Sequence, residues 1–213
     1  MIDILRNSKV VGIPFDKEIY KLHKWEKSER NAVLNEAFRI IEKDGILCEF
    51  GVLKGKTLRL IAQQFPDRRI FGFDSFEGLP EEWKINKDLT FEKGRMFLGY
   101  LPEVPENVKL VKGWYNETIP NWKIDLKEKI SFLHIDCDLY SSTKTILTEL
   151  DSFIEPGCII VFDEMYSWND ESAYSEWADG EYKALVEWID EKQREVEIIC
   201  RNNYLQCCIR ITK

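Results

Sequence analysis

Apolar and polar positions follow two patterns in the first half of the chain, one typical of helices and one typical of strands. Residues 30–43 place apolar side chains at helical spacing, and the apolar run at 46–50 is too short for a helix. Residues 58–65 repeat the helical spacing, and 69–74 form a compact apolar run that ends on Asp74. The pattern predicts helix, strand, helix and strand, which completes one βαβ unit.

Three further apolar runs predict strands at 108–113, 130–136 and 158–163, and each ends where polar residues begin. Strands that alternate with helices form a parallel sheet with right-handed crossovers. The ligand crevice of such a sheet lies at the carboxyl ends of its strands. We therefore expect the chemistry of this chain at the residues that follow the strands.

Two more helices are expected in the second half. Ser142 or Thr143 can cap the first, and Pro156 with Gly157 stops it. The second covers residues 180–193. The apolar stripe of the first consists of Ile146, Leu147, Leu150, Phe153 and Ile154.

The last stretch predicts a hairpin, because residues 195–200 and 204–211 are apolar runs joined by Arg-Asn-Asn. An antiparallel strand at the edge of a parallel sheet is the arrangement of class I methyltransferases, whereas ordinary dinucleotide-binding sheets stay parallel. We predict an α/β fold with a doubly wound, Rossmann-like methyltransferase sheet, mostly parallel with a C-terminal antiparallel hairpin.

The length of 213 residues fits a single domain over 1–213. Its N-terminal region, about 1–44, is expected to be helical. Residues of about 75–107 are rich in Pro, Gly, Glu and Lys and too irregular for a core element. This segment is interpreted as a lid or substrate loop.

Charge and cysteine content exclude several classes of protein. The net charge of −8 argues against nucleic acid as a partner, and no apolar run is long enough for a membrane span or a signal peptide. The six cysteines lie mostly within apolar runs and are interpreted as reduced core residues. A zinc site would find only His23 and His134 as further partners. We expect a cytoplasmic protein without a membrane or nucleic-acid partner.

The first strand leads into an acid and two glycines, Glu49, Gly51 and Gly55, before a helix. Glycine lets the backbone approach a ligand closely. This turn suits the methionine half of S-adenosylmethionine, and it lacks the glycine pattern of pyrophosphate binders. A plain strand-to-helix turn is the alternative.

Asp74 ends the second strand twenty-five residues after Glu49. An acid at this place can accept hydrogen bonds from both ribose hydroxyls of a nucleoside cofactor. The alternative is a turn or capping aspartate.

Acidic residues also follow the fourth and fifth strands. They are Asp136 and Asp138 in one case, and Asp163 with Glu164 in the other. Converging carboxylates repel one another unless a cation lies between them, and hard oxygen ligands suit Mg²⁺ or Ca²⁺. Such an ion could lower the pKa of an acceptor hydroxyl. Turn and cap acids are the alternative.

A proton acceptor is also needed, and Asp136, Asp138 and His134 qualify by position as catalytic bases. His134 has a second interpretation as a core residue, because it lies in an apolar run.

Several segments together resemble the macrocin O-methyltransferase family, whose members methylate sugar hydroxyls. The resemblance spans about residues 46–190. FDSFEGLP and the D-x-DLY-x-ST run are its most specific parts. The segments are CEFGVLKGKT, FGFDSFEGLPEEW, FEKGRMF, LVKGWYNETIP, HIDCDLYSST and EPGCIIVFDEMY.

This resemblance implies a metal-dependent O-methyltransferase that uses S-adenosylmethionine and Mg²⁺ or another divalent cation. The implied metal ligands are Asp136, Asp163 and Glu164, the last at a place where catechol-type enzymes commonly have Asp or Asn. It also implies a homodimer. The implied cofactor contacts are Glu49, Gly51, Gly55, Thr57, Asp74, Ser75, Gly113, Trp114 and Asp136.

The expected acceptor is a small molecule with a hydroxyl group, a sugar or glycosylated compound. Tyr166, Trp168, Tyr174 and Trp177 could stack on it, or they could form ordinary hydrophobic cover. A phenolic or catechol acceptor, a non-catalytic cofactor-binding protein and a nicotinamide oxidoreductase are the competing accounts. The acids at 136, 163 and 164 speak against mere cofactor binding, and the glycine pattern speaks against the oxidoreductase.

Overall fold

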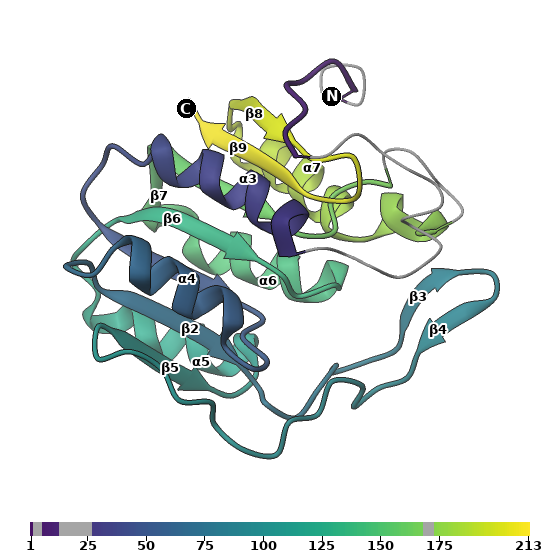
Figure 1. The fold of residues 1–213 in the computed structure, drawn as a ribbon, viewed down its shortest axis with the longest axis horizontal. Helices are drawn as coiled ribbons and strands as arrows, with labels where there is room; N and C mark the ends of the chain where they lie inside the picture. The colour runs from purple at the N-terminus through teal and green to yellow at the C-terminus, as the bar shows by residue number, and fades with distance from the viewer. Residues whose placement is uncertain (2–5, 13–26, 168–172) are drawn as a thin grey trace.

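The computed structural model describes residues 1, 6–12, 27–167 and 173–213, which fold around a seven-stranded sheet (Figure 1). The pairs from β5 to β7 are parallel, whereas β7–β9 and β9–β8 are antiparallel. The predicted fold is therefore confirmed, terminal hairpin included. In sheet order the strands are β5 (Val108–Lys112), β2 (Ile70–Asp74), β1 (Ile46–Phe50), β6 (Ile130–Ile135), β7 (Ile154–Phe162), β9 (Cys207–Ile211) and β8 (Val196–Arg201).

Helices cover both faces of the sheet (Figure 1). Successive strand residues point to opposite faces, so Leu47 packs with α3 and α4 while Phe50 packs with the opposite layer. This double cover explains why the central strands are apolar at almost every position. One layer holds α3 (Lys27–Arg39) and α4 (Lys56–Gln64), and the other holds α5 (Tyr115–Trp122), α6 (Tyr140–Leu150) and α7 (Glu181–Lys192).

The predicted ends of α6 are wrong. Leu139 precedes its first turn, and Ser142 and Thr143 lie inside the helix as buried residues. The helix stops at Leu150 and a 3-10 turn, η2 (Asp151–Phe153), leads directly into β7. Pro156 and Gly157 therefore belong to the strand, in a stretch where the pairing with β6 shifts register. A proline is tolerated at such an irregularity because no ladder hydrogen bond is needed from it.

Two elements were missing from the prediction. The segment 75–107 contains a small hairpin, β3 (Trp83–Asn86) and β4 (Leu89–Phe91), which extends from the main body (Figure 1). Helix α5 was not expected because it is short and carries a proline, Pro120, in its interior. Two further 3-10 turns are η1 (Lys123–Asp125) and η3 (Ser175–Asp179).

The six cysteines are all free and buried, as the sequence predicts. Within the residues that the structure describes, none of the helices combines the length and the apolar character that crossing a bilayer would require.

Candidate active site

A cavity of about 1090 Å³ lies at the carboxyl edge of the parallel strands. Each of the five parallel strands is followed by residues that line it, so the crevice is where the topology predicts. The volume slightly exceeds the usual range for one small ligand, roughly 300–1,000 Å³, and leaves room for a cofactor and an acceptor together. The predicted residues in its lining are Gly51, Thr57, Asp74, Ser75, Gly113, Trp114, Asp136, Asp138 and Glu164.

The turn after β1 brings two strand ends together. Gly51 has φ +95°, and a Cβ added there would collide with the carbonyl oxygen of Asp136. The Asp136 amide also donates to the Phe50 carbonyl at 2.9 Å. Glycine is thus required by the packing of β1 against β6. Gly55, in contrast, does not line the cavity, and its left-handed conformation starts α4.

Asp74 organises this turn with its carboxylate. Oδ2 accepts hydrogen bonds from the amides of Val52 (2.9 Å) and Leu53 (2.7 Å), and Oδ1 accepts one from Phe76 at 2.7 Å. The structure therefore shows the turn role that was the alternative for this residue. Asp74 also lines the cavity, so it remains available to a nucleoside.

Residues after β2 and β5 form the wall beside Asp74. The Gly113 amide donates to the Asp74 carbonyl at 3.0 Å, and Trp114 precedes the first turn of α5. Ser75 accepts from the Glu77 amide at 3.0 Å. Tyr115 was not predicted; it lines the cavity beside Trp114, and burial raises the pKa of its hydroxyl.

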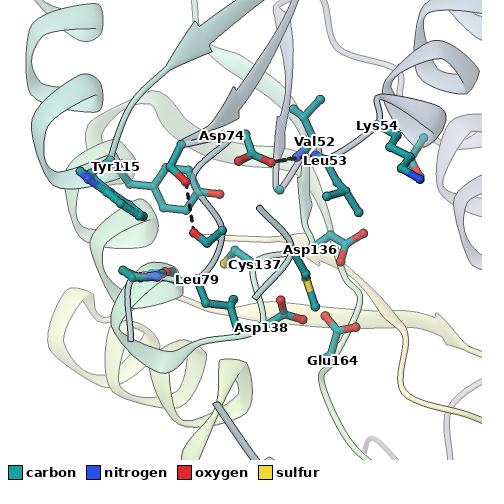
Figure 2. A pocket seen from close by; sticks show the side chains of 18 of the residues that line it. Val52, Leu53, Lys54, Asp74, Leu79, Tyr115, Asp136, Cys137, Asp138 and Glu164 are labelled. Carbon is teal, nitrogen blue, oxygen red and sulfur yellow. Dashed lines mark hydrogen bonds between the residues drawn. The ribbon is translucent and has the colours of Figure 1, made fainter. Parts of the chain in front are cut away.

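Three carboxylates gather on the side of the cavity opposite Asp74 (Figure 2). One ligand atom from each of Asp136, Asp138 and Glu164 lies within 4.8 Å of the other two. A second group with the same spacing joins Asp136 to His134 and Asp163. The predicted metal trio is therefore divided between two groups that share Asp136, and Asp163 does not line the cavity.

Asp138 has an unusual backbone. Its φ is +66°, in the left-handed region that residues other than glycine rarely adopt. The residue is 7% exposed. Backbone strain of this kind is typical of functional sites. Here it belongs to a carboxylate in the cavity lining.

His134 is buried between two carboxylates. It pairs with Glu49 in the register of β6 and β1, and its Nδ1 lies 3.0 Å from a Glu49 oxygen. Its Nε2 lies 3.5 Å from Asp163, whose carboxylate also accepts a hydrogen bond from Gln206. Burial lowers the pKa of His134, but the two carboxylates outweigh it and raise the pKa to about 10.

This buried group changes two expectations. Neither Glu49 nor His134 lines the cavity, and each is 1% exposed. The geometry supports the core interpretation of His134 rather than a base that faces an acceptor. The predicted contact of Glu49 with the cofactor stays a prediction.

The backbone of Glu164 is hydrogen-bonded to Glu181, a residue that the sequence analysis did not single out. Burial raises the pKa of the Glu164 carboxyl well above the usual value, and Asp163 and Asp136 act in the same direction. Its amide donates to a carboxylate oxygen of Glu181 at 3.1 Å. An acid in the first turn of a helix is common, so Glu181 carried no signal in the sequence.

The predicted aromatic cluster forms cover rather than cavity lining. Tyr166 packs on Trp177 with ring centroids 4.1 Å apart, and Tyr174 is 3% exposed. Trp168 lies outside the described residues. Trp83 of β3, which was not predicted, does line the cavity, and its Nε1 donates to the Tyr174 hydroxyl at 3.2 Å.

This architecture defines the class of protein. A mostly parallel doubly wound sheet with an antiparallel edge hairpin, and a cavity over its glycine turn and second-strand acid, is the fold of Rossmann-like methyltransferases. A family model described as Macrocin-O-methyltransferase (TylF) matches residues 27–192. The chain belongs to the macrocin O-methyltransferase family.

Two curated relatives were found in Streptomyces. The chain is 26% identical over 140 residues to demethyldecarbamoylnovobiocin O-methyltransferase of Streptomyces niveus. This alignment covers 56% of this chain and 52% of that protein. Identity and coverage are the same for 8-demethyl-8-(2,3-dimethoxy-alpha-L-rhamnosyl)-tetracenomycin-C 4'-O-methyltransferase of Streptomyces olivaceus. The matched region thus spans about half the length of these relatives.

Solved structures share the fold. Calicheamicin methyltransferase CalS11 has a TM-score of 0.64 at 22% identity, covering 98% of this chain and 89% of that chain. The O-methyltransferase NovP has a TM-score of 0.59 at 21% identity, covering 84% and 79%. At this identity the similarity concerns the fold.

Proposed function

We propose that this protein transfers the methyl group of S-adenosylmethionine to a hydroxyl of a sugar or glycosylated small molecule, with the help of a divalent cation. The observation that carries the proposal is the division of one cavity into two parts. One part has the glycine turn and Asp74, which suit a nucleoside, and the other has three carboxylates. In this arrangement the methyl donor would bind on one side of the cavity, and the acceptor hydroxyl would bind near the carboxylates on the other side.

The cofactor part has groups for both ends of S-adenosylmethionine. Asp74 and Ser75 suit the ribose, since carboxylate and hydroxyl oxygens accept hydrogen bonds from its hydroxyls. Thr57 is in the first turn of α4 and lines the cavity. The free amides of a helix N-terminus attract a carboxylate, so this turn suits the methionine end.

The acid part fits a hard divalent cation. Asp136, Asp138 and Glu164 supply oxygen donors close to one another, and their mutual repulsion is relieved when a cation lies between them. A bound Mg²⁺ would lower the pKa of an acceptor hydroxyl that reaches it. Asp163, held by His134 and Gln206, is proposed as the support of this site or as its fourth ligand.

The proposed transfer is a single displacement. The acceptor oxygen forms a bond to the methyl carbon while the carbon–sulfur bond breaks, and the sulfur keeps the electron pair in S-adenosylhomocysteine. The proton of the hydroxyl passes to a carboxylate. We assign this proton to Asp138 rather than to His134, because Asp138 lines the cavity whereas His134 is enclosed by carboxylates; Asp136, which also lines the cavity, is the second candidate.

The assignment of the acceptor follows the family. The names of the curated relatives describe O-methylation of demethyldecarbamoylnovobiocin and of a tetracenomycin that carries a rhamnosyl group. A phenolic acceptor is the second candidate within the same chemistry. We also propose a cytoplasmic location, consistent with six unpaired buried cysteines, a homodimer, and no nucleic-acid or membrane partner.

The first test is calorimetric titration with S-adenosylhomocysteine, with and without millimolar Mg²⁺, and with NAD as the control ligand. Micromolar binding of S-adenosylhomocysteine but not of NAD supports the cofactor, and an acceptor screen then starts from sugars. No binding under either condition would refute the proposal. Asp136→Asn should abolish turnover and leave the cofactor Kd within a few-fold, since it removes a metal charge.

A further inference from the structure

Glu181 is a buried carboxyl group that the proposed reaction does not use. It is the first residue of α7 and is 0% exposed. Burial raises the pKa of its carboxyl well above the usual value, and the carboxylate of Asp138 adds to this. Among the described residues, its Oε1 has no hydrogen-bond partner. Such a group costs folding free energy, so its presence in the core calls for a role.

A side-chain hydrogen bond of Glu181 reaches the acid site. Its Oε2 accepts from the Glu164 amide at 3.1 Å, although 17 residues separate the two in the chain. Glu164 is the second residue after β7, and its own carboxylate lines the cavity. Glu181 therefore contacts the backbone of this residue and not the space where an acceptor would bind, because Glu181 is not among the lining residues.

The backbone amides of this turn show what Glu181 adds. The Asp163 amide donates to Ile135 of β6 at 2.9 Å, and the Met165 amide donates to Leu205 at 3.0 Å. Both partners are backbone carbonyls. The Glu164 amide, between them, donates to a side chain. Without Glu181, this buried amide would lose its partner and the turn would lose its middle anchor.

Packing fixes the position from which Glu181 acts. Helix α7 begins after Gly180, and a Cβ added there would collide with the Tyr174 hydroxyl. That hydroxyl accepts a hydrogen bond from Trp83 of β3 at 3.2 Å. The first turn of α7 is thus packed against Tyr174, which also contacts the hairpin. This packing fixes the backbone that carries the Glu181 side chain.

We propose that Glu181 is a positioning residue that holds the Glu164 turn so that the Glu164 carboxylate faces Asp136 and Asp138 in a geometry that binds a divalent cation. The proposal rests on the metal-dependent function proposed above. Partners that orient metal ligands without touching the ion typically contribute about 10- to 100-fold to metal affinity. In this proposal the ability of Glu181 to accept a hydrogen bond from the Glu164 amide supports metal binding, and its negative charge does not.

The experiment measures Mn²⁺ affinity by electron paramagnetic resonance on full-length protein saturated with S-adenosylhomocysteine. Glu181→Gln keeps an oxygen that can accept from the Glu164 amide, so its Mn²⁺ Kd should stay within threefold of wild type. Glu181→Ala removes the acceptor and should weaken Mn²⁺ at least tenfold, with the S-adenosylhomocysteine Kd within threefold. The matched control is Glu187→Ala, on the same helix, whose carboxylate pairs with Tyr140 and Lys144 outside the cavity lining.

Each other outcome overturns the proposal. Equal losses in the Gln and Ala variants would mean that the negative charge itself binds the cation. No loss in the Ala variant would mean that the turn holds without Glu181. If Glu181→Ala does not fold, Glu181→Asp replaces it, because the shorter side chain keeps the charge but falls short of the Glu164 amide, and wild-type affinity in this variant would refute positioning.

The wild-type titrations separate this inference from the proposed function. Failure to bind S-adenosylhomocysteine refutes the methyltransferase proposal itself. Binding of S-adenosylhomocysteine without binding of Mn²⁺ leaves the cofactor assignment intact and overturns the role of Glu181.

Discussion

At the scale of single residues, the most consequential feature is a buried imidazole enclosed by two carboxyl groups. His134 lies between Glu49 and Asp163, and all three side chains are buried. The arrangement resembles a catalytic constellation in composition, but its members are absent from the cavity lining. The group links the carboxyl ends of β1 and β6 to the residue that follows β7.

Replacement of His134 should therefore affect stability before it affects the cofactor. His134→Ala leaves two buried carboxyl groups without the imidazole between them, and loss of one partner of a buried ion pair costs about 3–5 kcal/mol. Urea denaturation would measure the free energy of unfolding, and the S-adenosylhomocysteine Kd of the folded variant should stay within threefold. A stable variant that has lost only turnover would instead identify His134 as the base.

The pH dependence of stability provides an independent check of the same group. The folded-state pKa of His134, about 10, lies above its ordinary value of 6.5. Its contribution to stability is therefore fully present below pH 6.5 and is lost as the pH rises toward 10. The free energy of unfolding should fall over this window in wild type and fall less in His134→Ala. Parallel pH profiles for the two proteins would exclude a charged His134.

Asp74 has an observed role in the turn and a proposed role in cofactor binding, and two measurements on one variant can separate them. Asp74→Ala should weaken S-adenosylhomocysteine by roughly 1.5–3 kcal/mol, the range for hydrogen bonds to a charged group. It should also lower the free energy of unfolding, since three amides lose their acceptor. Calorimetry and urea denaturation measure the two effects, with the exposed Asp67 before β2 as the control site. Loss of stability with unchanged cofactor affinity would reduce Asp74 to a turn residue.

At the scale of elements, the hairpin β3–β4 contributes to the cavity wall and contacts the segment before α7. Trp83 lines the cavity and donates a hydrogen bond to Tyr174, and Asn86 donates to the Ala173 carbonyl at 3.4 Å. The hairpin is thus anchored to the segment before α7 rather than to the sheet. The lid or substrate loop expected in this segment stays a prediction.

Trp83→Phe keeps an aromatic ring but removes the donor to Tyr174. Amide hydrogen exchange in residues 83–91 should become faster, because the hairpin loses an anchor. The KM for an acceptor should rise more than kcat falls, while cofactor affinity stays constant. Lys84→Ala, at an exposed position of the same strand, is the control. Exchange rates equal to wild type would show that the hydrogen bond does not hold the hairpin.

The elements also show which sequence signals were sufficient. The buried parallel strands were found to within a few residues, because a short continuous apolar run between polar segments is typical of a strand covered on both faces. Helix α5 was missed since Pro120 normally interrupts a helix. The ends of α6 were misplaced because Ser142, Thr143 and Pro156 are ordinary boundary residues that here lie inside elements.

At the scale of the whole molecule, both helical layers pack on one sheet, so ligand binding at its edge should stabilise the entire chain. S-adenosylhomocysteine at 100 times its Kd should raise the free energy of unfolding by about 2.7 kcal/mol, provided that it binds only the folded state. Thermal unfolding with and without the ligand measures this shift as a single transition. A transition that splits, with one part insensitive to the ligand, would contradict a single cooperative domain.

Local pattern alone determined the order along the chain of the strands in the main sheet, the class of that sheet and which strand ends border the cavity. Strand ends meet at one edge of a parallel sheet, so acids and glycines that follow strands must converge there. Tertiary structure alone decided which acids face the cavity and which face the core. Asp163 and Glu164 are neighbours in sequence but join different groups. Asp163 packs against His134 and Gln206, whereas the backbone amide of Glu164 donates a hydrogen bond to the Glu181 carboxylate. Such a division depends on side chains from β6, α7 and the segment before β9, and no spacing within a single segment records it.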